Sequence, residues 1–416
     1  MRLLHFADLH IGVESYGRPD PETGLNTRLQ DFLRAFDELA EQALARQVDA
    51  VIFAGDAYKS REPSQTHQRE FARRVARIAA AGIPVYLLVG NHDVPAALHR
   101  AHALEIFPTL AVENVHVGDR LGTQVLQTRS GPLQVTGVPW PTPAQLLTRE
   151  DYRGKSIVQV NEIVSDLIRQ QLRAEASRID PALPAVLTAH LAMDVRNVRT
   201  ASESSMVVGQ FPVFFPETVA LREYDYVALG HHHPYQVLRE RPPVVYAGSM
   251  QRVDFGEEKD PKGFVVVELD PALPQGERCV SHELVEVMAR RFVTVKVTPS
   301  AQDPTDEVVE RLRRAGIEDA IVRVVVELRA DQQRALRSAA LDAELARAHH
   351  ARIQVVLVDA ARTRVAVDGS VEALGPLDLL RLYFDEHRVP SEAREELERA
   401  AQGLLDEADL AGIEEG

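Results

Sequence analysis

The sequence predicts an α/β (α+β) protein that combines a two-sheet layered domain, a small α+β domain and a C-terminal helical pair. Three observations lead to this prediction. Runs rich in Val and Ile, too short for helices, alternate with amphipathic helical segments. A turn-rich stretch at residues 270–276 interrupts this alternation. A leucine-rich helical pattern with many acidic residues then ends the sequence.

Eight apolar runs in the first two thirds of the chain are interpreted as strands. They span residues 3–7, 50–54, 85–89, 133–138, 185–189, 226–229, 244–247 and 264–269. Helical patterns at about residues 29–45 and 65–81 separate the first three runs, which predicts parallel strands with right-handed crossovers. The later runs follow one another more closely, so we expect a second, more antiparallel sheet. Together they form one domain over residues 1–275.

Two further parts follow the break. Apolar runs at 292–297, 320–327 and 352–358 alternate with helical patterns at 306–315 and 332–348, which predicts a separate α+β domain over residues 285–370. Residues 365–376 have the character of a linker, and residues 375–416 form an acidic helical pair. Such a pair at a chain end is typical of a partner-binding element. An acidic tail that packs on its own domain fits the pattern equally well.

Composition restricts the class of protein. The 416 residues carry a net charge of −15, which argues against a simple basic nucleic-acid-binding module. The single cysteine, Cys279, excludes an internal disulfide framework and a zinc site built from several cysteines. No uncharged apolar stretch is long enough to span a bilayer, and Asp8 comes too early for a secretory signal. We therefore expect a cytoplasmic protein without a membrane partner.

Polar side chains end five of the predicted strands. The segments are Asp8-Leu9-His10, Gly55-Asp56, Gly90-Asn91-His92-Asp93, His190 and Gly230-His231-His232-His233. Ligands of open α/β sheets gather beyond the carboxyl ends of the strands. One such motif alone is readily explained by a structural histidine and a cap. Five converging strand ends predict a shared binding site instead.

The residue types at these ends point to metal ions. Carboxylate, imidazole and amide oxygen ligands suit divalent manganese, iron or zinc. Seven candidate ligands are too many for one ion, whereas two ions roughly 3.5–4 Å apart with a bridging carboxylate would use them all. The candidates are Asp8, His10, Asp56, Asn91, His190, His231 and His233. We interpret His5 and His232 as structural. Asp93 either orients His92 or caps the following helix, and the cap is the preferred interpretation.

These five motifs, in this order, resemble those of the calcineurin-like metallophosphoesterases. The resemblance implies a first metal ion held by Asp8, His10, Asp56 and His233. It implies a second ion held by Asp56, Asn91, His190 and His231, with Asp56 as the bridge. It also implies that His92 lies beside the phosphate as the catalytic acid. A protein phosphatase is disfavoured, because residues 55–61 lack the second Asp and the final Gly of that class's motif.

Longer segments resemble the SbcD nuclease family. They are residues 2–12, 48–56, 188–190, 224–231, 246–249 and 255–257. The resemblance implies a DNA nuclease with two manganese ions per subunit, with magnesium, iron or zinc as other possible metals. It implies a 3′–5′ exonuclease on duplex ends and an endonuclease on single strands and hairpins. Such enzymes act in DNA double-strand-break repair, recombination and replication, and are nucleoid-associated when bound to DNA.

The same resemblance implies several partners. Residues 285–370 resemble a capping domain that contacts DNA, and residues 375–416 resemble the segment that docks on an SbcC-type coiled-coil ATPase. Helices that correspond to residues 62–81 and 96–107 mediate dimerisation in relatives, so we expect a homodimer; burial within their own domain is the alternative. Two other functions remain open. One is an architectural, DNA-tethering partner of the ATPase, and the other is a small-molecule phosphodiesterase.

Overall fold

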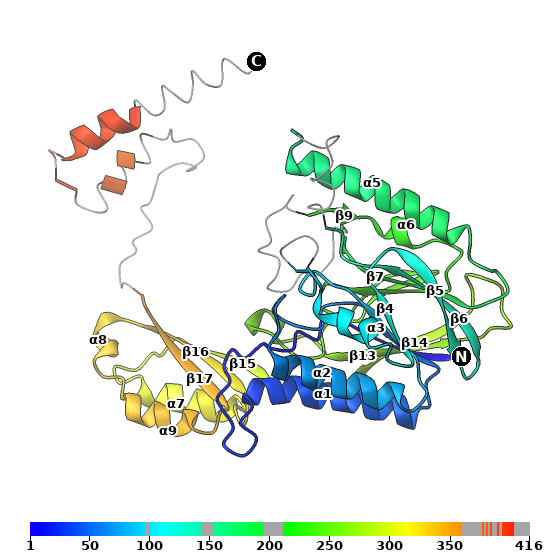
Figure 1. Cartoon of the computed structure of the whole chain (residues 1–416). Coiled ribbons are helices and arrows are strands. Elements are labelled where there is room, and N and C mark those ends of the chain that lie inside the picture. Colours follow the sequence, from blue (N-terminus) through cyan, green and yellow to red (C-terminus); the bar gives the residue numbers. More distant parts are fainter. Residues whose placement is uncertain are drawn as a thin grey trace. The chain divides into compact units, whose positions relative to one another are not determined.

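The computed structural model describes residues 1–95, 100–142, 154–194, 211–358, 377, 380–381, 383–384, 389–390 and 393–402. The chain divides into two compact units, Met1–Leu357 and Val358–Gly416. The described residues of the first unit form two six-stranded sheets, a three-stranded sheet and a two-stranded sheet (Figure 1). The two-stranded sheet pairs β8 (Ala192–Met193) with β9 (Val213–Phe214).

The first sheet has the order β14-β13-β1-β2-β3-β4. Its strands are β1 (Arg2–Phe6), β2 (Ala50–Phe53), β3 (Val85–Leu88), β4 (Val115–Gly118), β13 (Gly263–Leu269) and β14 (Cys279–Glu286). Strands β1 to β4 are parallel, β13 is antiparallel to β1, and β14 is antiparallel to β13. Helices α1 (Thr27–Ala45) and α2 (Gln65–Ala79) form the two crossovers that the sequence predicts, within two residues of the expected bounds.

The second sheet has the order β11-β12-β10-β7-β6-β5. Its strands are β5 (Gly122–Thr128), β6 (Gly131–Val138), β7 (Ala185–His190), β10 (Tyr226–Gly230), β11 (Gln236–Glu240) and β12 (Pro243–Tyr246). The four central strands are parallel and only the two edge strands are antiparallel.

The expectation of a more antiparallel second sheet is therefore wrong, because each six-stranded sheet has three parallel and two antiparallel strand pairings. The sequence pattern also failed to predict helix α5 (Ile157–Ala176), which connects β6 to β7. Parallel neighbours need such a crossover. Ser156 and Gln159 form a capping box that fixes the start of this helix.

The two six-stranded sheets pack face to face, with helices on both outer faces. In β1, Leu3 points into the core between the sheets, whereas Leu4 and Phe6 pack against α1. On the other side, Leu172 of α5 and Val219 of α6 (Pro216–Val219) cover the second sheet. The carboxyl ends of the parallel strands are the places where the predicted site residues lie. The short helices η1 (Ala103–Glu105) and α3 (Ile106–Thr109) precede β4.

The third sheet is built from residues that the sequence assigns to the small α+β domain. Strands β15 (Phe292–Val297), β16 (Ile321–Leu328) and β17 (His350–Leu357) are parallel and lie in this order. Helix α7 (Thr305–Arg314) follows β15, and α8 (Ala330–Gln333) and α9 (Ser338–Leu345) follow β16. The order of elements is as expected, but the single helix predicted over 332–348 is wrong. The backbone N–H of Arg337 donates instead to the Thr305 hydroxyl of α7, which interrupts the helix.

Strand β14 extends the first sheet beyond residue 275, the expected domain boundary, so the assignment of three domains stays a prediction. The expected linker 365–376 and residues 403–416 of the expected helical pair lie outside the described residues. In the second unit, residues 393–402 are helical, and Arg394 donates hydrogen bonds to the carbonyls of Phe384 and Val389. Across the described residues, none of the helices has the length and apolar character needed to cross a membrane.

The helices expected at a dimer interface have mixed surroundings. Phe71, Val75 and Ile78 of α2 are buried in the core beneath the first sheet, as the alternative interpretation predicts. Leu104 is also buried, Ile106 is 46% exposed, and Leu98 lies outside the described residues. Homodimer formation therefore stays a prediction.

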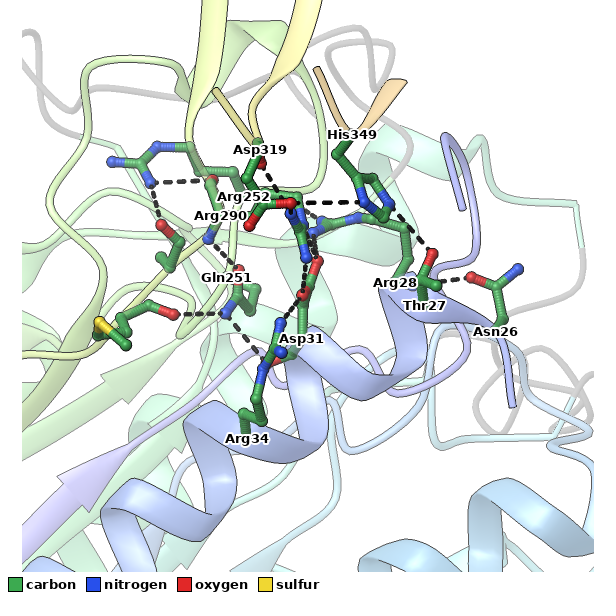
Figure 2. Close-up of polar contacts among 12 residues, drawn as sticks. Asn26, Thr27, Arg28, Asp31, Arg34, Gln251, Arg252, Arg290, Asp319 and His349 are labelled. Carbon is green, nitrogen blue, oxygen red and sulfur yellow. Dashed lines mark hydrogen bonds and ion pairs between the residues drawn. The ribbon is translucent and has the colours of Figure 1, made fainter. Parts of the chain in front are cut away.

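A buried ionic cluster attaches the third sheet to the start of α1 (Figure 2). The carboxylate of Asp31 accepts hydrogen bonds from Arg28 and from Arg290, which lies two residues before β15, at 2.7 Å each. Arg290 also donates to Asp319 beside β16, and the Thr27 hydroxyl lies 3.0 Å from Nε2 of His349. The side chain of Asp31 is 1% exposed. A single buried carboxylate thus connects two arginines from distant parts of the chain.

We expect Asp31→Ala to lower the free energy of unfolding by about 3–5 kcal/mol, because it leaves the buried guanidinium group of Arg28 without its anion and leaves Arg290 with only the exposed carboxylate of Asp319. The matched control is Asp37→Ala on the same helix. Asp37 pairs with Arg74 but is 38% exposed, so its loss should cost less than about 1 kcal/mol. Urea unfolding of both variants measures the difference, and equal losses would contradict a central role for Asp31.

Candidate metal centre

Five strand ends from the two large sheets meet at one place. Strands β1, β2 and β3 come from the first sheet, and β7 and β10 come from the second. The loops after β1 and β2 run side by side, since Asp8 N–H donates to the Gly55 carbonyl and His10 N–H donates to the Asp56 carbonyl. The tertiary structure therefore brings together the segments that the sequence singles out.

Two glycines allow these loops to approach closely. A Cβ added to Gly90 would lie 2.2 Å from Oδ1 of Asp56, and one on Gly55 would lie 2.3 Å from Nδ1 of His190. Larger residues would therefore displace candidate ligands. The backbones of Asp8, Asp56 and His231 have φ values of 51°, 64° and 109°, a region that residues with side chains rarely occupy. Strain of this kind is concentrated at functional sites.

The seven predicted metal ligands lie together and are buried. Ligand atoms of Asp8, His10 and His233 lie within 4.8 Å of one another, as do those of Asp8, Asp56 and His190. The Asn91 side-chain oxygen is 2.9 Å from Nε2 of His190 and 3.1 Å from Nδ1 of His231. The Nε2 atoms of His10 and His233 are 2.9 Å apart. Ligand atoms of His10, Asp56 and His92 form a third such group, so Asp8 and Asp56 each belong to two groups and the arrangement suits two neighbouring ions.

The Asp56 carboxylate provides a test of whether a cation fits. Its Oδ2 atom is buried and has no hydrogen-bond partner among the described residues. This oxygen lies 3.4 Å from Nε2 of His190 and 3.8 Å from Nε2 of His10. Buried polar atoms are nearly always satisfied, and a metal ion would satisfy this one together with the ring nitrogens that face it. The residues therefore fit a pair of divalent cations.

Charges within the centre shift its pKa values strongly. Burial raises the pKa of Asp8 to about 6, although the imidazoles of His190 and His233 oppose this rise. Burial alone would also raise the pKa of Asp56, but His190, His10 and His92 hold it well below its usual range. Burial lowers the pKa of His190, yet the carboxylates of Asp56 and Asp8 outweigh burial and raise it to about 9. Protons and metal ions therefore compete for the same side chains.

His92 lies at the rim of this cluster, where its ring makes an edge contact with that of His10 at 4.9 Å between centroids. Its backbone N–H donates to Oδ1 of Asp56 at 2.8 Å, and its Nδ1 lies 2.9 Å from the Lys59 carbonyl. A carbonyl can only accept, so Nδ1 carries the proton and Nε2 is the basic nitrogen. This tautomer suits exchange of a proton with a group bound at the centre.

Asp93 has a role that the sequence analysis did not predict, while the expected cap of the following helix falls at residues 96–99, outside the described residues. Its carboxylate accepts hydrogen bonds from the backbone N–H groups of Gly90, Asp56 and Ala57, at 2.9 to 3.0 Å. Burial, with the Asp56 charge, raises its pKa to about 7. Asp93 therefore fixes the loops after β2 and β3 relative to each other. The sequence alone does not reveal this role, because its partners lie up to 37 residues away.

Two further residues next to the ligands were missed. The Trp140 ring lies 4.9 Å from that of His231 and 5.6 Å from that of Phe211. It follows β6 closely, so the rule that directs attention to strand ends could have found it. Glu257 accepts a hydrogen bond from Nδ1 of His233 at 2.7 Å. Burial alone would raise the pKa of Glu257, but His233 and Lys262 lower it to about 2.

We expect the affinity of the centre for a divalent metal to rise as the pH rises from about 6 to about 9. Below pH 9 the metal must displace a proton from His190, and near pH 6 it must also displace one from Asp8. Each displaced proton should change the affinity roughly tenfold per pH unit. Calorimetric titration with Mn²⁺, alongside quenching of Trp140, the chain's single tryptophan, measures this dependence. An affinity that does not change with pH would contradict it.

Several known proteins are similar to this chain. It is 29% identical over 333 residues to the DNA double-strand break repair protein Mre11 of Haloferax volcanii, which covers 79% of this chain and 62% of that protein. It is 27% identical over 270 residues to the SbcD subunit of the nuclease SbcCD from Escherichia coli K12, which covers 62% of each. The corresponding nuclease subunit of Bacillus subtilis 168 is 25% identical over 354 residues, 82% of this chain and 83% of that protein. The chain thus spans less than two thirds of the length of the first two relatives.

A family model described as calcineurin-like phosphoesterase matches residues 1–235, more than half of the 416 residues. The match includes every predicted ligand and His92. The expected two-sheet metallophosphoesterase architecture is confirmed, with the centre at the ends of its strands. This chain belongs to the calcineurin-like phosphoesterase family.

Proposed function

We propose that this protein is a manganese-dependent DNA nuclease that works with an SbcC-type coiled-coil ATPase in double-strand-break repair, recombination and replication. The observation that carries the proposal is the buried Asp56 carboxylate, which lies among imidazoles from both sheets. The relatives named as a break-repair protein and as nuclease subunits support DNA as the substrate. The proposed activities are those of a 3′–5′ exonuclease on duplex ends and an endonuclease on single strands and hairpins, in the cytoplasm.

In this proposal the seven ligands hold two ions. Asp8, His10, Asp56 and His233 would hold one, and Asp56, Asn91, His190 and His231 would hold the other. When bound, the ion pair lowers the pKa of a shared water and offsets the negative charge of the phosphate. Nδ1 of His190 lies 2.7 Å from the Ala54 carbonyl, which orients its Nε2 toward the centre.

His92 is the proposed acid. The Asp56 carboxylate holds its backbone and the Lys59 carbonyl holds its ring. When Nε2 has also taken up a proton, the resulting imidazolium can give that proton to the oxygen that leaves phosphorus, or donate a hydrogen bond to the phosphate. The Trp140 ring packs on the His231 ring, with 4.9 Å between their centroids.

The third sheet supplies positive charge that the net charge of −15 conceals. Arg323 and Arg352 are paired in register on β16 and β17. They lie on the face opposite Val322 and Val324, which pack in the core of this part. DNA contact by this sheet, homodimerisation, and docking of the ATPase on residues 375–416 are parts of the same proposal. Local arginines can bind phosphates even where the whole chain is acidic.

We expect His92→Ala to lower the rate of DNA hydrolysis at least roughly 100-fold while Mn²⁺ binding is retained, because it removes an acid and no ligand. The measurement is cleavage of labelled duplex and hairpin DNA with Mn²⁺, with calorimetry for the metal. His282→Ala, a histidine on edge strand β14, is the control and should cleave at the normal rate. Cleavage by His92→Ala at the unaltered rate would exclude the assigned role. Faster turnover of bis(4-nitrophenyl) phosphate or cyclic nucleotides than of DNA would point to a small-molecule phosphodiesterase.

Removal of residues 375–416 tests the proposed docking segment. The truncated protein should keep its Mn²⁺-dependent cleavage of DNA, because every proposed ligand lies in the first unit. It should no longer co-purify with a co-expressed SbcC-type ATPase. The measurement is pull-down of the ATPase by the full and truncated chains. A complex of undiminished yield with the truncated chain would disprove this assignment.

A further inference from the structure

The turn that contains η4 (Phe255–Glu257) lies between the metal centre and the third sheet. On its inner side, Glu257 accepts a hydrogen bond from Nδ1 of His233 at 2.7 Å. Its other carboxylate oxygen is 2.7 Å from Nζ of Lys262, and both side chains are fully buried. Because Nδ1 of His233 carries the proton in this bond, its Nε2 lone pair faces the other ligands. Glu257 thus determines both the tautomer and the orientation of a proposed ligand.

Neighbouring residues of the same turn contact the third sheet. The carboxylate of Glu258 accepts hydrogen bonds from the backbone N–H and the hydroxyl of Thr294 in β15, at 2.9 and 2.6 Å. The Phe255 ring lies 4.9 Å from the ring of Phe292, also in β15. The guanidinium of Arg323 in β16 lies 4.4 Å from the centre of the Phe255 ring. One short turn therefore contacts a ligand on one side and two strands of the third sheet on the other.

Arg252 provides a second connection. It donates to the Glu257 and Asp260 carbonyls at 3.2 and 2.9 Å, and to the Arg290 carbonyl at 3.2 Å. Figure 2 shows Arg252 beside Arg290, whose own side chain reaches Asp31 of α1. The turn and the segment that enters β15 are thus held by one guanidinium group.

We infer that Glu257 is a positioning residue for His233 and that the third sheet controls its position through Glu258 and Phe255. Displacement of this sheet would move Glu257 and weaken the metal site that contains His233. Because linkage between two equilibria is reciprocal, metal binding must in turn stabilise the contact between Glu258 and Thr294. The inference rests on the proposed role of His233 as a ligand, and it adds a route by which a bound partner or DNA can regulate the centre.

A purely structural role of the turn predicts a different outcome. In that case Glu257 and Lys262 form a buried pair that stabilises the fold, and contacts with β15 do not affect the metal. Glu258 separates the two cases, because it contacts Thr294 and none of the proposed ligands. Its removal leaves the pair of Glu257 and Lys262 intact.

Titration calorimetry with Mn²⁺ on the full chain, without DNA, tests the inference. Loss of a group that orients a ligand typically weakens metal affinity 10- to 100-fold, so Glu257→Ala should raise the Mn²⁺ dissociation constant about tenfold or more. Glu257→Gln keeps an oxygen acceptor for His233, so it should raise the Mn²⁺ dissociation constant less than Glu257→Ala does. Glu258→Ala should raise the constant about fivefold, the lower end of usual coupling between sites. The control is Glu327→Ala in β16. The carboxylate of Glu327 accepts a hydrogen bond from Thr298, so its removal should leave the Mn²⁺ dissociation constant unchanged.

Amide hydrogen exchange gives an independent readout. Mn²⁺ should slow exchange at Thr294 in the unaltered protein and in Glu327→Ala, and should not slow it in Glu258→Ala. If Glu258→Ala leaves the Mn²⁺ dissociation constant unchanged and metal still protects Thr294 from exchange, the inference that the third sheet controls the position of Glu257 is wrong. An unchanged constant in both Glu257 variants would overturn the positioning role. Failure of the unaltered protein to bind Mn²⁺ would contradict the proposed function instead.

Discussion

The metal centre depends on one constraint, the burial of a negative charge where the two large sheets meet. The carboxylate of Asp56 lies beyond the end of β2 and is 1% exposed. Such a burial is costly unless positive charge or donors compensate for it. Imidazoles from both sheets surround the carboxylate and compensate for its charge. The ends of β1, β3, β7 and β10 therefore have to converge on the same place. The four-layer arrangement of helices and sheets provides that convergence.

Backbone geometry around this carboxylate is correspondingly tight. Asp93 holds the loops after β2 and β3 through three backbone N–H groups, and Gly90 leaves no room for a side chain beside Asp56. Left-handed backbones at Asp8, Asp56 and His231 show that the loops bend sharply as soon as the strands end. The packing of the hydrophobic cores around the centre offsets the free energy of this strain.

The third sheet is part of the same system. Asp31 attaches it to α1, and the turn around Glu257 attaches it to His233. Both attachments are buried and charged, and buried ionic contacts are sensitive to small displacements because a broken pair leaves an uncompensated charge. A domain held in this way can transmit its position to the metal ligands. In the coupling inferred above, the calcineurin-like core and the added sheet act as one system.

The sequence by itself determined the local elements and the chemistry at their ends. Alternating apolar runs and amphipathic segments predicted β1, β2, β3 and β13 and the two crossovers of the first sheet, because these depend on neighbours within one turn or one strand. They did not predict the edge strands β4 and β14. Asp8, His10, Asp56, Asn91, His190, His231 and His233 were singled out as candidate ligands because they follow strand ends directly.

Only the tertiary structure decided which of these ends meet and what supports them. The parallel second sheet depended on α5, whose role as a crossover is set by the pairing of β6 with β7. The contacts of Asp93 with Asp56, of Glu257 with His233 and of Arg290 with Asp31 join residues 37, 24 and 259 positions apart. Such contacts leave no periodic pattern in the chain, because they are created when the layers pack.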